Sequence, residues 1–472
     1  MEGSAGETGA RDPGTRDPGT RDAGSRPGDR VPYVATAVVL LAFIAISQLI
    51  PAARVHFPSN LAPLFLRWDP VVGPWVIAPV VLAIIGVAAA PRMLELPAWR
   101  LLAVLVVFAW VFAMTLAVQA GQAKTFQRGT LPGGTSTALT AVLQRDSDYY
   151  GDVPLIDRLG PRRFAERFPE LDRIHTTTLA THSTTHPPGA PLFAWVLSRL
   201  TGGSLLAVAV VYVLIGALGV LPTYAIAREL SGERTAKVAA VLFACSPGVL
   251  IYSATSEDIV FMTATAIAIA ALVRAPRSDR WALVTGALTA LAMCVTWGAL
   301  SLGIIGVGAG LIALRAQPAG AVIRRGMLAV ASLVVSGLAI RLFTGIDLLA
   351  DFGPTRIRQE AYLTYDRSYG YWLLGNLAAF LIAVGIAHTA LLVGVTRDAW
   401  RERRPGMETV IWVTLLLLSV GGEFKGETDH NWLFLLPLVV AVSATATDRV
   451  RGVAAAGFAQ AIGTEILFYT AW

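Results

Sequence analysis

The sequence predicts an all-α polytopic membrane protein with about thirteen transmembrane helices. Of its 472 residues, 55% are hydrophobic and only 15% are charged, whereas soluble domains carry roughly 25% charged residues. The mean hydropathy is +0.60. The apolar residues also occur in long blocks between short charged loops, as a bilayer core needing ~20 apolar residues per crossing requires. This pattern excludes a cytosolic enzyme, a nucleic-acid binder and a disordered scaffold.

The basic balance of the chain reflects its topology. The net charge is +6, and of the 38 basic residues only Lys124, Lys237 and Lys425 are lysines. With many Ala, Val and Gly residues, this arginine preference indicates a high-GC genome of the actinobacterial type. Many arginines lie in short loops between apolar blocks, where basic residues set membrane orientation. The two cysteines, Cys245 and Cys294, lie inside apolar blocks and imply no disulfide framework.

The chain divides into a tail and one membrane domain. Residues 1–31 repeat the pattern Arg-Asp-Pro-Gly-Thr, which cannot bury a core, so we expect a disordered cytoplasmic tail. Residues 32–472 form the predicted transmembrane domain. The expected spans are 33–53, 70–90, 99–120, 203–225, 236–253, 258–274, 281–297, 299–315, 325–344, 372–395, 407–421, 431–447 and 452–470. Segment 188–201 is short for a crossing, and we expect a re-entrant or interfacial helix there, or one of a pair of imperfect crossings.

Loop charges predict the orientation. With a cytoplasmic N-terminus and thirteen crossings, nearly every short basic loop falls on the cytoplasmic side. The loops left outside are those rich in acidic, histidine and aromatic residues: 121–187, 253–258, 345–371 and 421–430. We therefore expect a multi-pass cell-membrane protein whose functional site is extracytoplasmic. Loop 121–187 is too long for a simple connection, and we expect short helices within it.

Loop 121–187 contains two groups of candidate residues. Asp146 and Asp148 are two residues apart beside two tyrosines; such carboxylates suit a general base with an orienting or metal-holding partner, or a solvated acidic turn. A divalent cation, Mg²⁺ or Mn²⁺, is a hypothesis for this pair. His182 and His186 precede Pro187-Pro188, which argues against a continuous helix carrying a metal pair. A histidine that donates to a phosphate or sugar oxygen is the favoured interpretation.

The remaining outer loops supply further candidates for substrate binding. Glu257 and Asp258 stand where two apolar blocks meet, a position equally suited to a polar hairpin turn. Arg356 and Arg358 lie among tyrosines that suit either an interfacial belt or a phosphate and a sugar. The densest charged cluster between two spans is in 421–430, and ionisable residues there indicate function by default; its candidates are Glu423, Lys425, Glu427 and His430.

Taken in order, these motifs resemble the GT-C superfamily of integral-membrane glycosyltransferases. The resemblance is carried by the acidic pair, by His186-Pro187-Pro188-Gly189, by the run from Leu221 to Arg234 with the following Cys245-Ser246-Pro247 and Tyr252-Ser253, and by the late segment Gly426 to Phe434. It covers about 140–440. The acidic pair follows the third apolar block, where the family has it after the first, and its two acids are not adjacent.

The resemblance implies a fold of about a dozen helices with a loop-built cavity at the outer face. It also implies a polyprenyl-phosphate sugar donor, a mannosyltransferase-like activity and Asp146 as the catalytic aspartate, with Asp148 second. The acceptor would be an extracytoplasmic glycan, lipid or protein, and a single displacement would invert the anomeric carbon. The chemistry agrees, because a sugar hydroxyl needs a base and a leaving phosphate needs a cation: Lys425, Arg356, Arg358 or His186. The alternatives are a transporter or flippase of lipid-linked sugars, which should show inverted repeats and broken spans, and an inactive relative that binds a lipid or partner protein.

Overall fold

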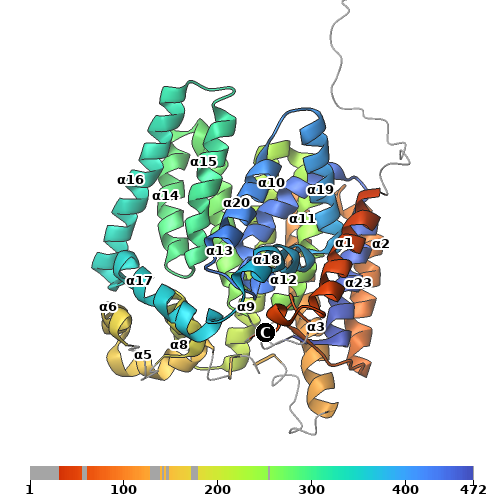
Figure 1. Cartoon of the computed structure of the whole chain (residues 1–472), viewed down its shortest axis with the longest axis horizontal. Helices are drawn as coiled ribbons and strands as arrows, with labels where there is room; N and C mark the ends of the chain where they lie inside the picture. Colours follow the sequence, from red (N-terminus) through yellow and green to blue (C-terminus); the bar gives the residue numbers. More distant parts are fainter. Residues whose placement is uncertain are drawn as a thin grey trace, which may run out of the picture.

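The computed structural model describes residues 31–55, 61–127, 139–140, 143–144, 148–171, 179–253 and 256–470. The chain is almost entirely helical (Figure 1), which confirms the predicted all-α membrane fold. The helices are α1 Val31–Ser47, α2 Ile77–Met93, α3 Ala98–Gln127, α5 Val153–Leu159, α6 Pro161–Arg167, α7 Thr181–Thr185, α8 Gly189–Leu200, α9 Leu205–Leu218, α10 Val220–Ser231, α11 Glu233–Ala244, α12 Pro247–Tyr252, α13 Asp258–Leu272, α14 Asp279–Met293, α15 Leu302–Ala313, α16 Ala319–Thr344, α17 Leu348–Gln359, α18 Tyr369–Val384, α19 Ile386–Arg401, α20 Met407–Gly421, α21 Thr428–Asn431, α22 Leu436–Ser443 and α23 Val450–Leu467.

Among the described residues, six helices are long and apolar enough to cross a membrane, or seven if the bent pair α18–α19 is one span. The predicted count of thirteen is therefore not confirmed. Several predicted spans are broken in the structure, and each piece alone is short. The block 236–253, for example, divides into α11 and α12 because Pro247 begins a new helix after Ser246, and proline cannot continue the preceding one.

The predicted span 372–395 is the clearest difference from the sequence expectation. It consists of α18 and α19, which meet at an angle of 109°. The break lies at Gly385, whose φ of 117° is a backbone conformation that L side chains rarely adopt. Gln460 of α23 satisfies the freed backbone groups: it donates to the Ile382 carbonyl at 2.7 Å and accepts from the Ile386 N–H at 3.0 Å. A break inside the membrane is tolerated when side chains bond the freed groups in this way.

Segment 188–201 forms α8, whose twelve residues extend about 18 Å, less than the roughly 30 Å of a bilayer core. It packs with α5 near the lower edge in Figure 1. At the same end a small antiparallel sheet pairs β1 Leu66–Trp68 with β2 Phe468–Thr470. The sheet attaches the C-terminal end of the described chain to the segment between α1 and α2.

The basic loops gather at the opposite end of the bundle. Arg315, after α15, donates to the Pro405 carbonyl at 2.6 Å, which joins the α15–α16 and α19–α20 loops. Arg234 pairs with Asp448 at 3.1 Å. Figure 1 shows the α15–α16 and α19–α20 loops at the top of the bundle and α5, α6, α8 and α17 at the bottom. Which of these ends faces the cytoplasm stays a prediction from the loop charges.

Candidate active site

A cavity with an empty volume of about 720 Å³ lies at the end of the bundle opposite the basic loops. Its walls come from five separate parts of the chain: the 3-10 turn η4 Tyr149–Asp152 with α7, the start of α13, the 3-10 turn η7 Trp297–Ser301, the end of α17, and the segment before α22. The predicted site residues that line it are Asp148, His182, His186, Glu257, Asp258, Glu427 and His430. The fold thus brings together residues up to 282 positions apart in sequence.

Loop 148–186 contributes an aromatic and imidazole wall. Asp148 is buried and caps η4, since its Oδ1 accepts the Tyr150 backbone N–H at 3.2 Å. The Tyr149 ring lies edge-on to the His186 ring, with centroids 5.5 Å apart. Burial raises the pKa of Tyr149 well above its usual value, so its phenol stays protonated. The tyrosine therefore offers an O–H group beside the imidazole.

His186 ends α7 in an extended conformation, which agrees with the expectation that Pro187 and Pro188 stop a helix there. Its Nδ1 lies 3.2 Å from the His182 carbonyl. Burial lowers the pKa of His186, so the ring is neutral near pH 7. If Nδ1 carries the proton and donates to that carbonyl, Nε2 is left as a hydrogen-bond acceptor. In this state the ring accepts a hydrogen bond from a sugar hydroxyl group. A phosphate oxygen would instead require a hydrogen-bond donor.

The junction before α13 supplies two adjacent carboxylates. Glu257 is buried; its Oε1 accepts the Tyr212 hydroxyl at 3.1 Å, while its Oε2 has no hydrogen-bond partner in the described part of the chain. Burial, and then the nearby Asp148 carboxylate, raise the pKa of Glu257. Asp258 accepts the Ser256 hydroxyl at 2.7 Å. The hairpin-turn interpretation does not account for a buried carboxylate oxygen left without a partner.

The segment after α20 is held by one buried amide from α18. Asn376 donates to the Phe424 carbonyl at 2.7 Å and accepts the Gly426 N–H at 2.9 Å. Glu427 follows in a left-handed conformation, φ 62°, and pairs with the buried Arg367 at 2.8 Å. The segment is therefore fixed to α18, which packs against it.

His430 occupies the centre of this segment. Its Nδ1 lies 3.2 Å from Asp429 Oδ1, and its Nε2 lies 4.0 Å from Glu427 Oε2. Asp429 Oδ2 in turn accepts the Tyr252 hydroxyl at 3.0 Å and the Phe65 backbone N–H at 2.9 Å. The imidazole is therefore held between two carboxylates, one of which is itself fixed by two donors.

Four predicted residues do not line the cavity. Arg356 and Glu423 pair with each other at 2.8 Å on the surface. Arg358 is buried and donates to the Phe168 and Pro169 carbonyls at 3.3 and 2.9 Å. The Lys425 carbonyl accepts from Arg367 at 2.8 Å. Asp146 lies outside the described residues, as does most of the predicted tail.

Several lining residues were not predicted from the sequence. Thr296 and Trp297 lie at the end of the expected span 281–297, and the Trp297 indole Nε1 is buried without a hydrogen-bond partner among the described residues. Gln359 and Asn431 complete the polar wall. The signal available in the sequence was the polar Thr296 and the flexible Gly298 at a junction between two spans, where transmembrane helices break.

The described residues include no group of three or more His, Cys, Asp or Glu side chains placed to hold a metal ion. Side chains of the cavity that could ligate a metal are hydrogen-bonded to other protein groups, as His430 is to Asp429. The hypothesis of a divalent cation at Asp146 and Asp148 involves a residue outside the described part of the chain, so it stays a prediction.

Comparison with known families bears on this arrangement. Residues 185–340 match the family model described as dolichyl-phosphate-mannose-protein mannosyltransferase. This match confirms the predicted GT-C resemblance. The matched stretch begins at the His186-Pro187-Pro188 motif and contains Glu257, Asp258 and Trp297, so it supplies three of the walls of the cavity. The matched stretch is about a third of the chain, and its apolar helices agree with the expected multi-pass membrane protein.

Two solved structures are also similar, both of the oligosaccharyltransferase from Archaeoglobus fulgidus. One is a complex with Zn and sulfate, with 15% identity, a TM-score of 0.40, and coverage of 58% of this chain and 44% of that one. The other, AglB with an inhibitory peptide and a dolichol-phosphate, has 13% identity, a TM-score of 0.44, and coverage of 72% and 50%. The chain thus spans half or less of the length of those two structures. Comparison with curated proteins gives no significant match.

Proposed function

We propose that this chain transfers a sugar from a polyprenyl-phosphate donor to a hydroxyl group of an extracytoplasmic acceptor: a cell-envelope glycan, a glycolipid or a protein. The observation that carries the proposal is the convergence of Asp148, His186, Glu257, Asp258 and His430 in one cavity at a membrane-helix end. The matching family is named for a polyprenyl-type phosphate-linked mannose donor, which makes mannose the first sugar to test.

The reaction is a single displacement. The acceptor oxygen attacks the anomeric carbon, the bond from that carbon to the phosphate oxygen breaks, and its electron pair leaves with the lipid phosphate. The hydroxyl proton passes to a carboxylate, for which Asp146 and Asp148 are the candidates. Inversion at the anomeric carbon follows from attack on the face opposite the leaving group.

Other cavity groups bind and orient. The Trp297 N–H is a buried donor suited to a phosphate or sugar oxygen. Burial raises the pKa of Glu257, which favours the protonated carboxyl, and that form is a donor as well. His186 Nε2 accepts from a sugar hydroxyl. His430, fixed by Asp429, is the imidazole we assign to the departing phosphate, since Lys425, Arg356 and Arg358 do not line the cavity.

The orientation is part of the proposal. The arginine-rich end with Arg315 and Arg234 would face the cytoplasm by the positive-inside rule, together with the N-terminus. The cavity would then open on the extracytoplasmic side.

The experiment is sugar transfer in membranes supplied with radiolabelled polyprenyl-phosphate mannose. Asp148→Asn and Asp146→Asn are each compared with the wild type at equal expression. We expect the rate of transfer to fall about 100-fold or more in the variant that lacks the base. Asp448→Asn, an exposed acid at the opposite end, is the matched control and should keep wild-type activity.

Full activity in both aspartate variants would refute the assignment of the base. A wild type that moves the labelled donor across vesicles without any transfer would instead favour the flippase. The break at Gly385 is a feature expected of transporters, but Gln460 bonds the backbone groups it frees, so they are not offered to a transported ion.

A further inference from the structure

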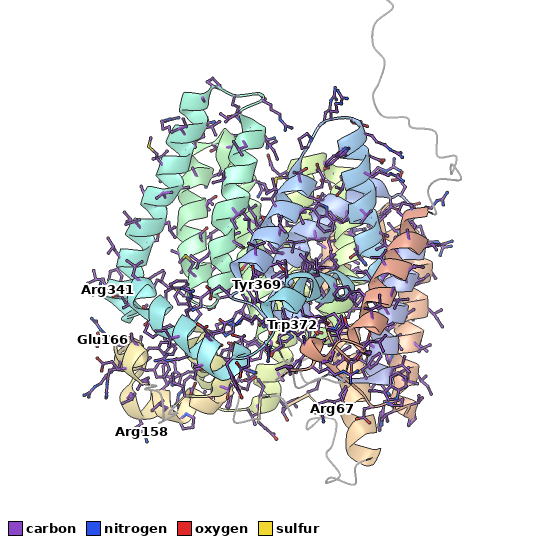
Figure 2. The ribbon with its side chains drawn as sticks, in the orientation of Figure 1. Arg67, Arg158, Glu166, Arg341, Tyr369 and Trp372 are labelled. Atoms are coloured by element: carbon purple, nitrogen blue, oxygen red, sulfur yellow. The ribbon has the colours of Figure 1, made fainter. Side chains whose placement is uncertain are left out.

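A second cleft lies beside the cavity, between α6, the end of α16 and the start of α17. Its empty volume is about 1040 Å³, and its charged lining residues are Arg162, Glu166, Arg341, Asp347 and Asp351. Figure 2 labels Arg341 at the end of α16 directly above Glu166 of α6, at one edge of the molecule. The proposed reaction does not use any of these residues.

Gly345 allows α6 to lie close to the turn between α16 and α17, at the edge of this cleft. This residue ends α16 in the left-handed region, φ 85°, and a Cβ there would lie 2.9 Å from both the Arg162 carbonyl oxygen and Glu166 Cγ. Only glycine lets α6 approach the α16–α17 turn so closely. Asp347 then caps α17 by accepting the Leu349 and Ala350 N–H groups at 3.2 and 3.1 Å.

Four of the five charged residues form two ion pairs at the rim of the cleft, one within α6 and one between the end of α16 and the cap of α17. Arg162 pairs with Glu166 at 2.8 Å, and Arg341 pairs with Asp347 at 3.0 Å. Both arginines remain more than half exposed, so their other N–H groups are available to a ligand. The two pairs together carry no net charge.

Asp351 is the exception. It is fully buried, and neither carboxylate oxygen has a hydrogen-bond partner in the described part of the chain. Burial, and then the nearby Asp347 carboxylate, raise the pKa of Asp351 from 3.8 to about 7. A buried polar group left without a partner destabilises a fold, which a ligand that bonds it would offset.

The cleft adjoins the candidate active site. Phe352, the residue after Asp351, packs edge-on against Trp297, with ring centroids 5.2 Å apart, and Trp297 lines the active-site cavity. α17 also packs against α7, which carries His182. The contact between Phe352 and Trp297 therefore links α17, which borders the cleft, to the wall of the active-site cavity.

We propose that this cleft binds the saccharide chain of the acceptor, with Asp351 as a binding residue for its hydroxyl groups. This rests on the proposed function and names the acceptor class. Sugar hydroxyls donate to a carboxylate and accept from guanidinium groups, which matches a buried acid below a rim of arginines. A phosphate is a poor match, because both rim arginines are already paired with carboxylates and leave no surplus positive charge for it.

The test measures binding, so it does not depend on turnover. Purified full-length protein in nanodiscs is titrated calorimetrically with three neutral hexasaccharides: mannohexaose, maltohexaose and arabinohexaose. We expect the wild type to bind at least one of them and Asp351→Ala to weaken that binding about tenfold or more, the equivalent of about 1.4 kcal/mol. Asp351→Asn, which keeps an acceptor oxygen, should give an intermediate affinity.

A second measurement separates binding from a structural role. If Asp351 serves a ligand, Asp351→Asn and Asp351→Ala should leave the thermal midpoint of the ligand-free protein unchanged or raise it, as removal of an unpaired buried carboxylate does. Asp448→Ala is the control for both measurements. Equal binding by wild type and Asp351→Ala, no binding of any hexasaccharide by the wild type, or displacement of the bound sugar by inorganic phosphate would each overturn the proposal. A wild type that binds a hexasaccharide but transfers no sugar would count against the proposed function alone.

Discussion

Replacing Asn376 by alanine should disable the candidate active site from outside it. Asn376 is fully buried and does not line the cavity, yet its amide holds the segment that carries Phe424, Glu427 and His430. The alanine variant removes both amide bonds, to the Phe424 carbonyl and from the Gly426 N–H. These two backbone groups then lose the partner that fixes them.

The magnitude follows from those two bonds. Each buried group left unsatisfied costs about 1–3 kcal/mol, so two cost about 2–6 kcal/mol. Because the segment borders a cavity that water enters, we expect the lower end, about 2 kcal/mol. If this energy goes into displacing the segment from its productive position, the transfer rate falls about 30-fold, since 1.36 kcal/mol corresponds to a factor of ten.

The assay compares initial rates of transfer from polyprenyl-phosphate mannose with thermal midpoints in detergent. Thr414→Val is the matched control, because it also removes one buried side-chain hydrogen bond, here from the Thr414 hydroxyl to the Val410 carbonyl of its own helix. Since such a bond within a helix contributes little to stability, this variant should change the rate less than about twofold. An Asn376→Ala variant with wild-type rate and midpoint would refute the reasoning that this amide positions the site.

Two further predictions concern the fold. Gly385→Ala should lower the thermal midpoint by the equivalent of about 1–3 kcal/mol, because φ is 117° and the new Cβ would lie 2.8 Å from Pro247 Cδ. Gly463→Ala, where a Cβ meets open space, is the control. Equal thermal midpoints in the two variants would contradict the prediction. Burial raises the pKa of Asp152 from 3.8 to about 6, although its Oδ1 accepts the Ala180 N–H at 3.0 Å. The folded state therefore holds this proton more tightly than the unfolded state, and the free energy of unfolding should fall by up to about 3 kcal/mol as the pH rises from about 4 to 6. Thermal midpoints across this pH range should show that slope in the wild type and lose most of it in Asp152→Asn; an identical slope in both would exclude Asp152 as its source.

Part of the candidate site was visible in the sequence because charge in an apolar context is conspicuous. Glu257, Asp258, Glu427 and His430 interrupt apolar blocks, where ionisable side chains are rare unless they are used, and the structure places all four in one cavity. The loop arginines likewise predicted the orientation of the bundle, which stays a prediction; in the structure Arg315 joins two of those loops through the Pro405 carbonyl.

Other residues had no such signal. Trp297 lies in an apolar stretch and reads as one more membrane aromatic; it became a site residue because η7 ends the block at the cavity wall. Arg356 and Glu423 were conspicuous by charge, but they pair with each other on the surface. Asp351 was not singled out, since its burial depends on how α17 packs against the rest of the chain, including α7.

The sequence by itself determined the class of this protein: a helical membrane chain with a GT-C-like order of motifs and a chemically distinct face. Composition and block length decide this, because a bilayer accepts only long apolar helices. Only the tertiary structure decided which polar residues meet. Gln460, 75 residues after Gly385, bonds the backbone groups freed at the 109° bend between α18 and α19. Asn376 bonds backbone groups 48 and 50 residues further along the chain. Such long-range pairing leaves no periodicity in the local sequence.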